Sequence, residues 1–224
     1  PDATMGRPYG LMPLGVPALV NELRDAGLSV RGVIYPLEKR LDPAFDLRGW
    51  LRSQSHSARI VLIDLHWYEH SYGAISVARI CREVLPEAWT VLGGLTASAY
   101  AGEILASQPA VDFVIRGEGE ATFRDLVNAL EEPEPDLTRI AGLSYRQGNS
   151  WRHNPDRPLL DLATLPLPRR EARLSQGFFF FDQTMDVVET SRGCPYDCKF
   201  CSITRMYGRN FRPFPLERTL ADLE

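Results

Sequence analysis

Apolar and polar positions alternate in blocks along the first 130 residues, and the blocks predict strands and helices in turn. The predicted strands are residues 30–35, 60–63, 90–92 and 113–115, and the predicted helices are residues 16–26, 46–53, 74–84, 98–107 and 121–130. Short apolar strands between helices predict an α/β fold with a parallel sheet covered on both faces. The series opens on a helix, so we expect the first, central strand of this Rossmann-like sheet to be missing and to precede Pro1.

The pattern changes after residue 130. The charged, proline-broken run 131–136 predicts a solvated boundary. A small hairpin (142–146 and 151–153, around Gly148-Asn149) and an extended crossover should follow, and Phe178–Phe181 should pack at a domain interface. A strand at 186–190, a turn at 191–193, a cysteine-rich loop and a helix from 218 onward then predict one βα unit of a barrel. We therefore expect three parts: 1–136, a connector at 137–184, and the start of a truncated barrel at 185–224.

Composition narrows the class of protein. With 224 residues, 44% of them hydrophobic, the chain can bury one good core and part of another. A net charge of −4 gives no electrostatic reason to expect a nucleic-acid partner. No apolar run reaches the roughly 18 residues of a membrane span, and no signal peptide is visible. We expect a cytoplasmic protein without a membrane partner, a setting that also suits reduced, clustered thiols.

Three of the four cysteines lie within eight residues, as Cys194, Cys198 and Cys201. Thiolates at this spacing can hold one face of a cubane iron–sulfur cluster, and the lack of a fourth cysteine leaves one iron open to another ligand. Zinc normally takes four ligands, but the nearest upstream histidine is His153. A disulfide would leave an odd thiol. We therefore consider a zinc site, a disulfide and three functionally unrelated cysteines less well supported than a cluster. Cys81 lies in an apolar helical pattern and is interpreted as a core thiol.

The unusual residues of the first 130 positions fall just after predicted strands. Ligands of parallel sheets bind outside the carboxyl ends of the strands. Glycines there let a bulky ligand approach the backbone, and aromatic rings offer a flat apolar floor. The candidate binding residues are Leu65, His66, Trp67 and Tyr68 after the second predicted strand, Gly93, Gly94 and Thr96 after the third, and Gly117, Glu118 and Gly119 after the fourth.

The cysteine motif resembles that of the radical S-adenosylmethionine (SAM) superfamily, CxxxCxΦC, with Phe200 at the aromatic position and Arg192-Gly193 before it. The resemblance implies a 4Fe–4S cluster on the three cysteines and SAM bound to the open iron, with Phe200 beside its adenine. It further implies reductive cleavage of SAM, hydrogen abstraction from a small-molecule substrate, and a reductase, flavodoxin or ferredoxin as electron donor. Most of the barrel is expected beyond Glu224, so residues 1–224 alone should have no catalytic activity.

The order of the earlier elements resembles the cobalamin-binding domain that precedes many radical-SAM barrels. The matching residues are Pro13-Leu14-Gly15, Gly93-Gly94-x-Thr96 and Gly117-Glu118-Gly119-Glu120-x-Thr122. The resemblance implies that the Gly93 and Gly117 loops hold the corrin and its nucleotide tail. Cobalamin mutases carry Asp-x-His-x-x-Gly, whose His ligates cobalt. Here Asp64-Leu65-His66 matches only the first half of that motif and follows a different strand. We therefore expect cobalamin to bind without a histidine ligand to cobalt, and we treat His66 and His70 as pocket residues.

The leading hypothesis is a cobalamin-dependent radical-SAM enzyme, most commonly a methyltransferase. Ring formation or rearrangement is also open within this group. One alternative is a radical-SAM protein whose first domain no longer binds cobalamin and serves as a scaffold. Another is a non-catalytic carrier of cobalamin or a cluster. The radical methylthiotransferases use further cysteines in the first domain, where only Cys81 is available, so we disfavour them.

Overall fold

A five-stranded mixed sheet organises the first two thirds of the chain. The computed structural model describes residues 15–25, 27–174, 178–180 and 183–224. The strands are β1 (Ile60–Asp64), β2 (Trp89–Gly93), β3 (Phe113–Ile115), β4 (Leu143–Gln147) and β5 (Ser150–His153), and they lie in the order β1-β2-β3-β4-β5. The first three are parallel, whereas the β4–β5 hairpin joins antiparallel to β3. The hairpin is therefore part of the same sheet. The domain boundary expected at residue 136 lies between β3 and β4, two neighbouring strands of this sheet.

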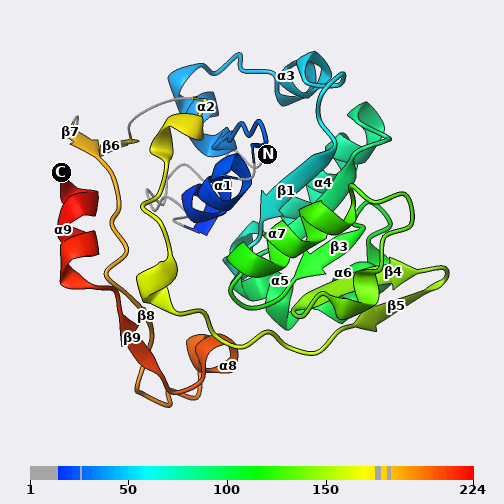
Figure 1. Ribbon diagram of the computed structural model, residues 1–224. Coiled ribbons are helices and arrows are strands. Elements are labelled where there is room, and N and C mark those ends of the chain that lie inside the picture. The colour runs from blue at the N-terminus through cyan, green and yellow to red at the C-terminus, as the bar shows by residue number, and fades with distance from the viewer. Residues whose placement is uncertain (1–14, 26, 175–177, 181–182) are drawn as a thin grey trace.

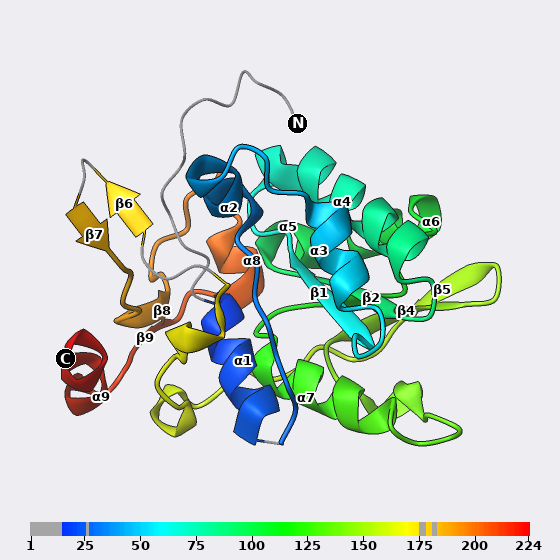
Figure 2. The same cartoon turned by 90° about the horizontal axis from the view of Figure 1, so that it is seen from above.

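Helices cover both faces of this sheet (Figure 1). On one face lie α3 (Leu47–Ser53), α4 (Ser71–Val84), α5 (Leu95–Ala99) and α6 (Ala101–Ser107); on the other lie α1 (Gly15–Asp25) and α7 (Glu120–Ala129), as Figure 2 shows. Successive residues of a strand point to opposite faces of the sheet. In β2, Leu92 packs in the core beneath the first group of helices and Val91 in the core beneath the second. In the described part of the chain, no helix has the length and apolar character needed to cross a bilayer.

Most predicted elements of this region are confirmed, and the α/β fold class with them. The strand predicted at 30–35 is wrong: Gly32 forms only an isolated bridge with Arg173, and α2 (Tyr35–Leu41) begins where the strand should end. Pro36 lies in the first turn of that helix, where its fixed φ and missing N–H are favourable. The single helix predicted at 98–107 is two helices, α5 and α6, which meet at Tyr100.

The rest of the chain forms short elements beside the sheet. They are η2 (Leu137–Arg139), η3 (Leu162–Thr164), η4 (Arg170–Ala172), β6 (Phe178–Phe180), β7 (Gln183–Met185), β8 (Ser191–Gly193), α8 (Ile203–Tyr207), β9 (Phe211–Pro213) and α9 (Leu216–Leu223), with η1 (Tyr68–His70) in the first part. β6 pairs with β7, and β8 pairs with β9, both antiparallel. The interface predicted for Phe178–Phe181 concerns side chains outside those that the structure describes.

The strand predicted at 186–190 is also wrong, and so is the turn predicted at 191–193. Residues 191–193 are themselves the strand β8. One reason is that the carbonyl of Val187 accepts a hydrogen bond of 2.8 Å from the guanidinium of Arg170, while the Asp186 carboxylate accepts one from the Val187 N–H. Side chains thus take up the backbone groups that a ladder would have used.

The buried side chain of Leu143 tests whether the β4–β5 hairpin belongs to the main core. Leu143 is fully buried with Val91, Phe113 and Leu126. We expect Leu143→Ala to lower the free energy of unfolding by about 3 kcal/mol, measured by urea denaturation. The matched control is Leu41→Ala, because Leu41 is 50% exposed and should change stability by less than about 0.5 kcal/mol. Equal effects of the two substitutions would contradict this assignment.

Candidate functional site

The three segments predicted to bind a ligand meet at one edge of the sheet, because β1, β2 and β3 are parallel. The first two are bonded together: the Leu65 N–H donates to the Gly93 carbonyl at 2.7 Å, and the Thr96 hydroxyl donates to the His66 carbonyl at 2.8 Å. Gly94 has φ of +107°, and a Cβ there would lie 2.8 Å from the Leu65 carbonyl group. Only glycine fits between these two segments.

Ser98 ties the third segment to the second. Its hydroxyl donates to the Gly94 carbonyl at 2.8 Å and accepts from the Gly117 N–H at 3.0 Å. Gly117 has φ of +75° and open space where a Cβ would lie. A ligand can therefore reach the Gly117 backbone without meeting a side chain at this position. Sequence reasoning missed Ser98, because the hydroxyl stands on a helix among small residues and only the fold brings it between the two loops.

Exposed aromatic rings surround the end of β1. Trp67 and Tyr68, which were predicted, are 45% and 69% exposed, and Tyr72 and Tyr100, which were not, are 77% and 45% exposed. The rings of His66 and Trp67 meet edge to face at 4.9 Å, and those of Tyr68 and Tyr100 lie 5.9 Å apart. Large exposed rings of this kind favour a flat, apolar ligand.

The ionisable groups of this edge are shifted toward their neutral forms. Burial raises the pKa of Asp64 to about 6, against a smaller opposite effect of its hydrogen bond from the His66 backbone. Burial also lowers the pKa of His66, and the nearby His70 lowers it further. At neutral pH the His66 ring is therefore uncharged, whereas Asp64, with a pKa of about 6, is largely ionised despite its burial.

The cysteine loop begins directly after β8. Cys194, Cys198 and Cys201 are free thiols, Cys198 is exposed, and the Cys201 N–H donates to the Cys198 carbonyl at 3.0 Å. Phe200 is 93% exposed. Gly193 has φ of +80°, and a Cβ there would lie 1.9 Å from the Asn210 carbonyl oxygen, so this position requires glycine.

The donor set of this loop fits an iron–sulfur cluster. Within the described ranges, no three His, Cys, Asp or Glu side chains converge closely enough to hold a single metal ion. A cubane cluster sets a different requirement, because each thiolate binds a different iron atom and the thiolates need not meet at one point. Three free thiols on one exposed loop meet this requirement.

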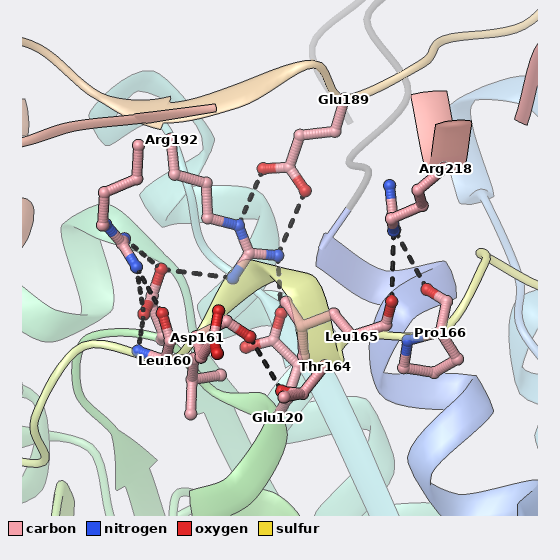
Figure 3. Close-up of polar contacts among 11 residues, drawn as sticks. Glu120, Leu160, Asp161, Thr164, Leu165, Pro166, Glu189, Arg192 and Arg218 are labelled. Atoms are coloured by element: carbon pink, nitrogen blue, oxygen red, sulfur yellow. Dashed lines mark hydrogen bonds and ion pairs between the residues drawn. The ribbon is translucent and has the colours of Figure 1, made fainter. Parts of the chain in front are cut away.

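The cysteine loop and the glycine loops are neighbours. Helix α8, which follows the cysteines, contacts α5, which follows Gly94. In addition, Arg192 of β8 reaches the loop after β3: its guanidinium donates to Glu118 at 3.2 Å and to Glu120 at 2.6 Å, and on its own segment it meets Glu189 at 2.9 Å. Figure 3 shows Glu120 and Glu189 pointing at Arg192.

A second arginine shares Glu118. Arg212 of β9, which lies opposite Arg192 in the pair, donates to the same Glu118 oxygen at 2.5 Å. Burial by itself lowers the pKa of Arg192, but attraction to Glu120 and Glu189 and hydrogen bonds to both raise this pKa above its ordinary value. The Glu118 carboxylate is thus engaged in ion pairs, and contact of this residue with a cofactor stays a prediction.

Comparison with known proteins agrees with the motifs. The B12 binding domain family matches residues 7–127. An uncharacterized methyltransferase of Pyrococcus horikoshii is 34% identical over 153 residues, which are 68% of this chain and 33% of the relative. The hopanoid C-3 methylase of Methylococcus capsulatus is 30% identical over 217 residues, 95% of this chain and 40% of the relative. The chain therefore spans about a third to two fifths of the length of these relatives.

Among solved structures, the radical S-adenosylmethionine methyltransferase TsrM of Kitasatospora setae, with cobalamin and a [4Fe-4S] cluster bound, superposes with a TM-score of 0.73. The match covers 95% of this chain and 43% of TsrM at 17% identity. The fold is therefore shared. Together with the matched family, it confirms the predicted resemblance to cobalamin-binding radical-SAM proteins.

The tight contact at Gly94 can be tested by substitution. We expect Gly94→Ala to lower the free energy of unfolding by roughly 3 kcal/mol, because the methyl group meets the Leu65 backbone and φ is positive. Gly117→Ala is the matched control: its φ is also positive, but the space is open, so a loss of about 1 kcal/mol is expected. Urea denaturation measures both. Similar losses in the two variants would show that the contact with Leu65 is not tight.

The buried Asp64 should make stability depend on pH. Its pKa is about 6 in the fold against 3.8 unfolded, so the folded state binds this proton more tightly. The contribution of Asp64 to stability is therefore fully present below about pH 4 and is lost as pH rises through 6. Asp64→Asn keeps the shape but does not ionise. Above pH 6 the variant should be more stable than the wild type by on the order of 2 kcal/mol, measured by urea denaturation on both sides of pH 6. An unchanged pH profile would refute this account of Asp64.

Proposed function

The chain belongs to the B12 binding domain family, and from this premise we propose that it is the cofactor-binding part of a cobalamin-dependent radical-SAM enzyme. Residues 1–136 would form the cobalamin domain, 137–184 the connector and 185–224 the start of the SAM domain, with the β4–β5 hairpin of the connector extending the sheet of the first domain. The whole protein would transfer a methyl group to a small-molecule substrate. Its electron would come from a reductase, a flavodoxin or a ferredoxin.

One observation carries this proposal: the cysteine loop and the glycine loops are joined by direct contacts. The helices that follow these loops, α5 and α8, touch each other, and Arg192 of the strand before Cys194 is bonded to the loop after β3. A reaction that uses two cofactors requires them close to each other and to the substrate. An isolated cobalamin carrier or an isolated cluster protein would not need this arrangement.

The residues have distinct tasks in this proposal. The backbone at Gly93, Gly94 and Gly117 would lie against the corrin and its tail, and the rings of Trp67 and Tyr68 would form an apolar floor. The three cysteine thiolates would hold the cluster, and Phe200 would lie beside the SAM adenine. When bound, these groups supply a methyl donor and a radical initiator, chemistry that the side chains of this chain do not provide.

Anaerobic reconstitution tests the proposal. The chain, supplied with iron, sulfide and hydroxocobalamin, should bind one cluster and one cobalamin, measured by iron analysis and optical spectra. Replacing Cys194, Cys198 and Cys201 by Ala should abolish the cluster and leave cobalamin bound. Cys81→Ala is the matched control, because this thiol is 1% exposed in the core of α4, and it should keep both cofactors.

The other outcomes would identify the alternative functions. A cluster without cobalamin would indicate a radical-SAM protein with a scaffold domain. A full-length protein that binds both cofactors and never cleaves SAM under reducing conditions would be a carrier. Either result would contradict the proposed enzyme.

A further inference from the structure

The strand that leads into Cys194 is held by side chains of the Gly117 loop. Arg192 lies two residues before Cys194 and donates to Glu118 at 3.2 Å and to Glu120 at 2.6 Å. The three side chains are 6%, 2% and 5% exposed. Ion pairs buried this deeply are little screened by water or salt. The base of the cysteine loop is therefore fixed by carboxylates that belong to the loop after β3.

The Glu118 carboxylate also binds the strand at the other end of the cysteine segment. Residues 194–210 lie between β8 and β9, and Arg192 is directly opposite Arg212 across this pair. Like charges in opposite positions of two strands repel each other. One oxygen of Glu118 accepts from both guanidinium groups, and the other accepts from the Leu160 N–H at 2.6 Å. Glu118 thus holds together the two strands between which the cysteines lie.

We infer that Glu118 and Glu120 are positioning residues that couple the cysteine loop to the Gly117 loop. The inference rests on the proposed function. Glu118 stands between Gly117 and Gly119, so a ligand that restricts this loop also restricts the carboxylate that holds Arg192 and Arg212. Binding of cobalamin and formation of the cluster then favour each other, by the same factor in both directions.

The coupling is measured with the full chain. Hydroxocobalamin is titrated anaerobically into protein with and without the reconstituted cluster, and the ratio of the two dissociation constants is the coupling factor. We expect the wild type to bind cobalamin about fivefold or more tightly when the cluster is present. Glu118→Gln keeps the shape but removes the charge, and should bring the factor close to one. Because a ratio is measured, a direct effect of the substitution on cobalamin affinity cancels.

Asp156→Asn is the matched control. Asp156 pairs with Arg116, the residue next to Gly117, but its side chain is 84% exposed. The substitution removes an ion pair beside the same loop and should keep the wild-type coupling factor. Glu120→Gln, which removes only one partner of Arg192, should give an intermediate factor and serves as the milder variant if Glu118→Gln does not fold.

A second measurement needs no cofactor. The rate of alkylation of Cys194 by iodoacetamide in the metal-free protein, followed by mass spectrometry, should rise in Glu118→Gln and Glu120→Gln and stay unchanged in Asp156→Asn. Unchanged alkylation in both glutamate variants would overturn the positioning role, and a coupling factor of one in a wild type that binds both cofactors would overturn the coupling. A wild type that fails to bind one cofactor would refute the proposed function, while alkylation still decides on the positioning role.

Discussion

The buried contact of Glu118 with Arg192 and Arg212 is the interaction on which the arrangement of the two halves depends. It joins the loop after β3, in the sheet, to both strands of the β8–β9 pair. Charges leave water only when they are paired and hydrogen-bonded. Here the Glu118 carboxylate accepts from three groups, the Leu160 N–H and the guanidinium groups of Arg192 and Arg212. Arg192 in turn donates to three carboxylates. The forked guanidinium suits such multiple acceptance, which an ammonium group could not reproduce.

Two glycines, Gly117 and Gly193, lie directly beside the residues of these ion pairs. Gly117, directly before Glu118, adopts a positive φ that side-chain-bearing residues rarely take, and the space where its Cβ would lie is open. Gly193 allows the opposite close approach, with the Asn210 carbonyl where a Cβ would lie. Gly117 therefore has open space beside its backbone, whereas Gly193 makes room for the backbone of Asn210. The two kinds of glycine look identical in the sequence and act differently in the fold.

The sequence pattern predicted correctly those elements whose conformation depends on neighbouring residues. The strand at 113–115 was predicted to the residue, because a short apolar run buried on both faces has few alternatives. The strand predictions at 30–35 and 186–190 failed because distant groups determine both segments. Gly32 is hydrogen-bonded to Ala172 and Leu174, and the Val187 carbonyl accepts a hydrogen bond from Arg170, 17 residues away. The two arginine partners of Glu118 lie 74 and 94 residues away. No sequence pattern identifies them, so sequence reasoning could place Glu118 at the binding edge but could not find its ion pairs.

Stability alone does not account for this buried network. Well-packed apolar side chains of similar volume often hold two segments together as well as buried ion pairs do, because they carry no desolvation cost. Apolar contacts, however, are non-directional and tolerate small shifts. Hydrogen-bonded charges do not, since a carboxylate moved away from its donors becomes an unpaired buried charge. A network that ends two residues before Cys194 therefore determines the orientation of the cysteine loop more sharply than it raises stability, and orientation is what the two proposed cofactor sites would require.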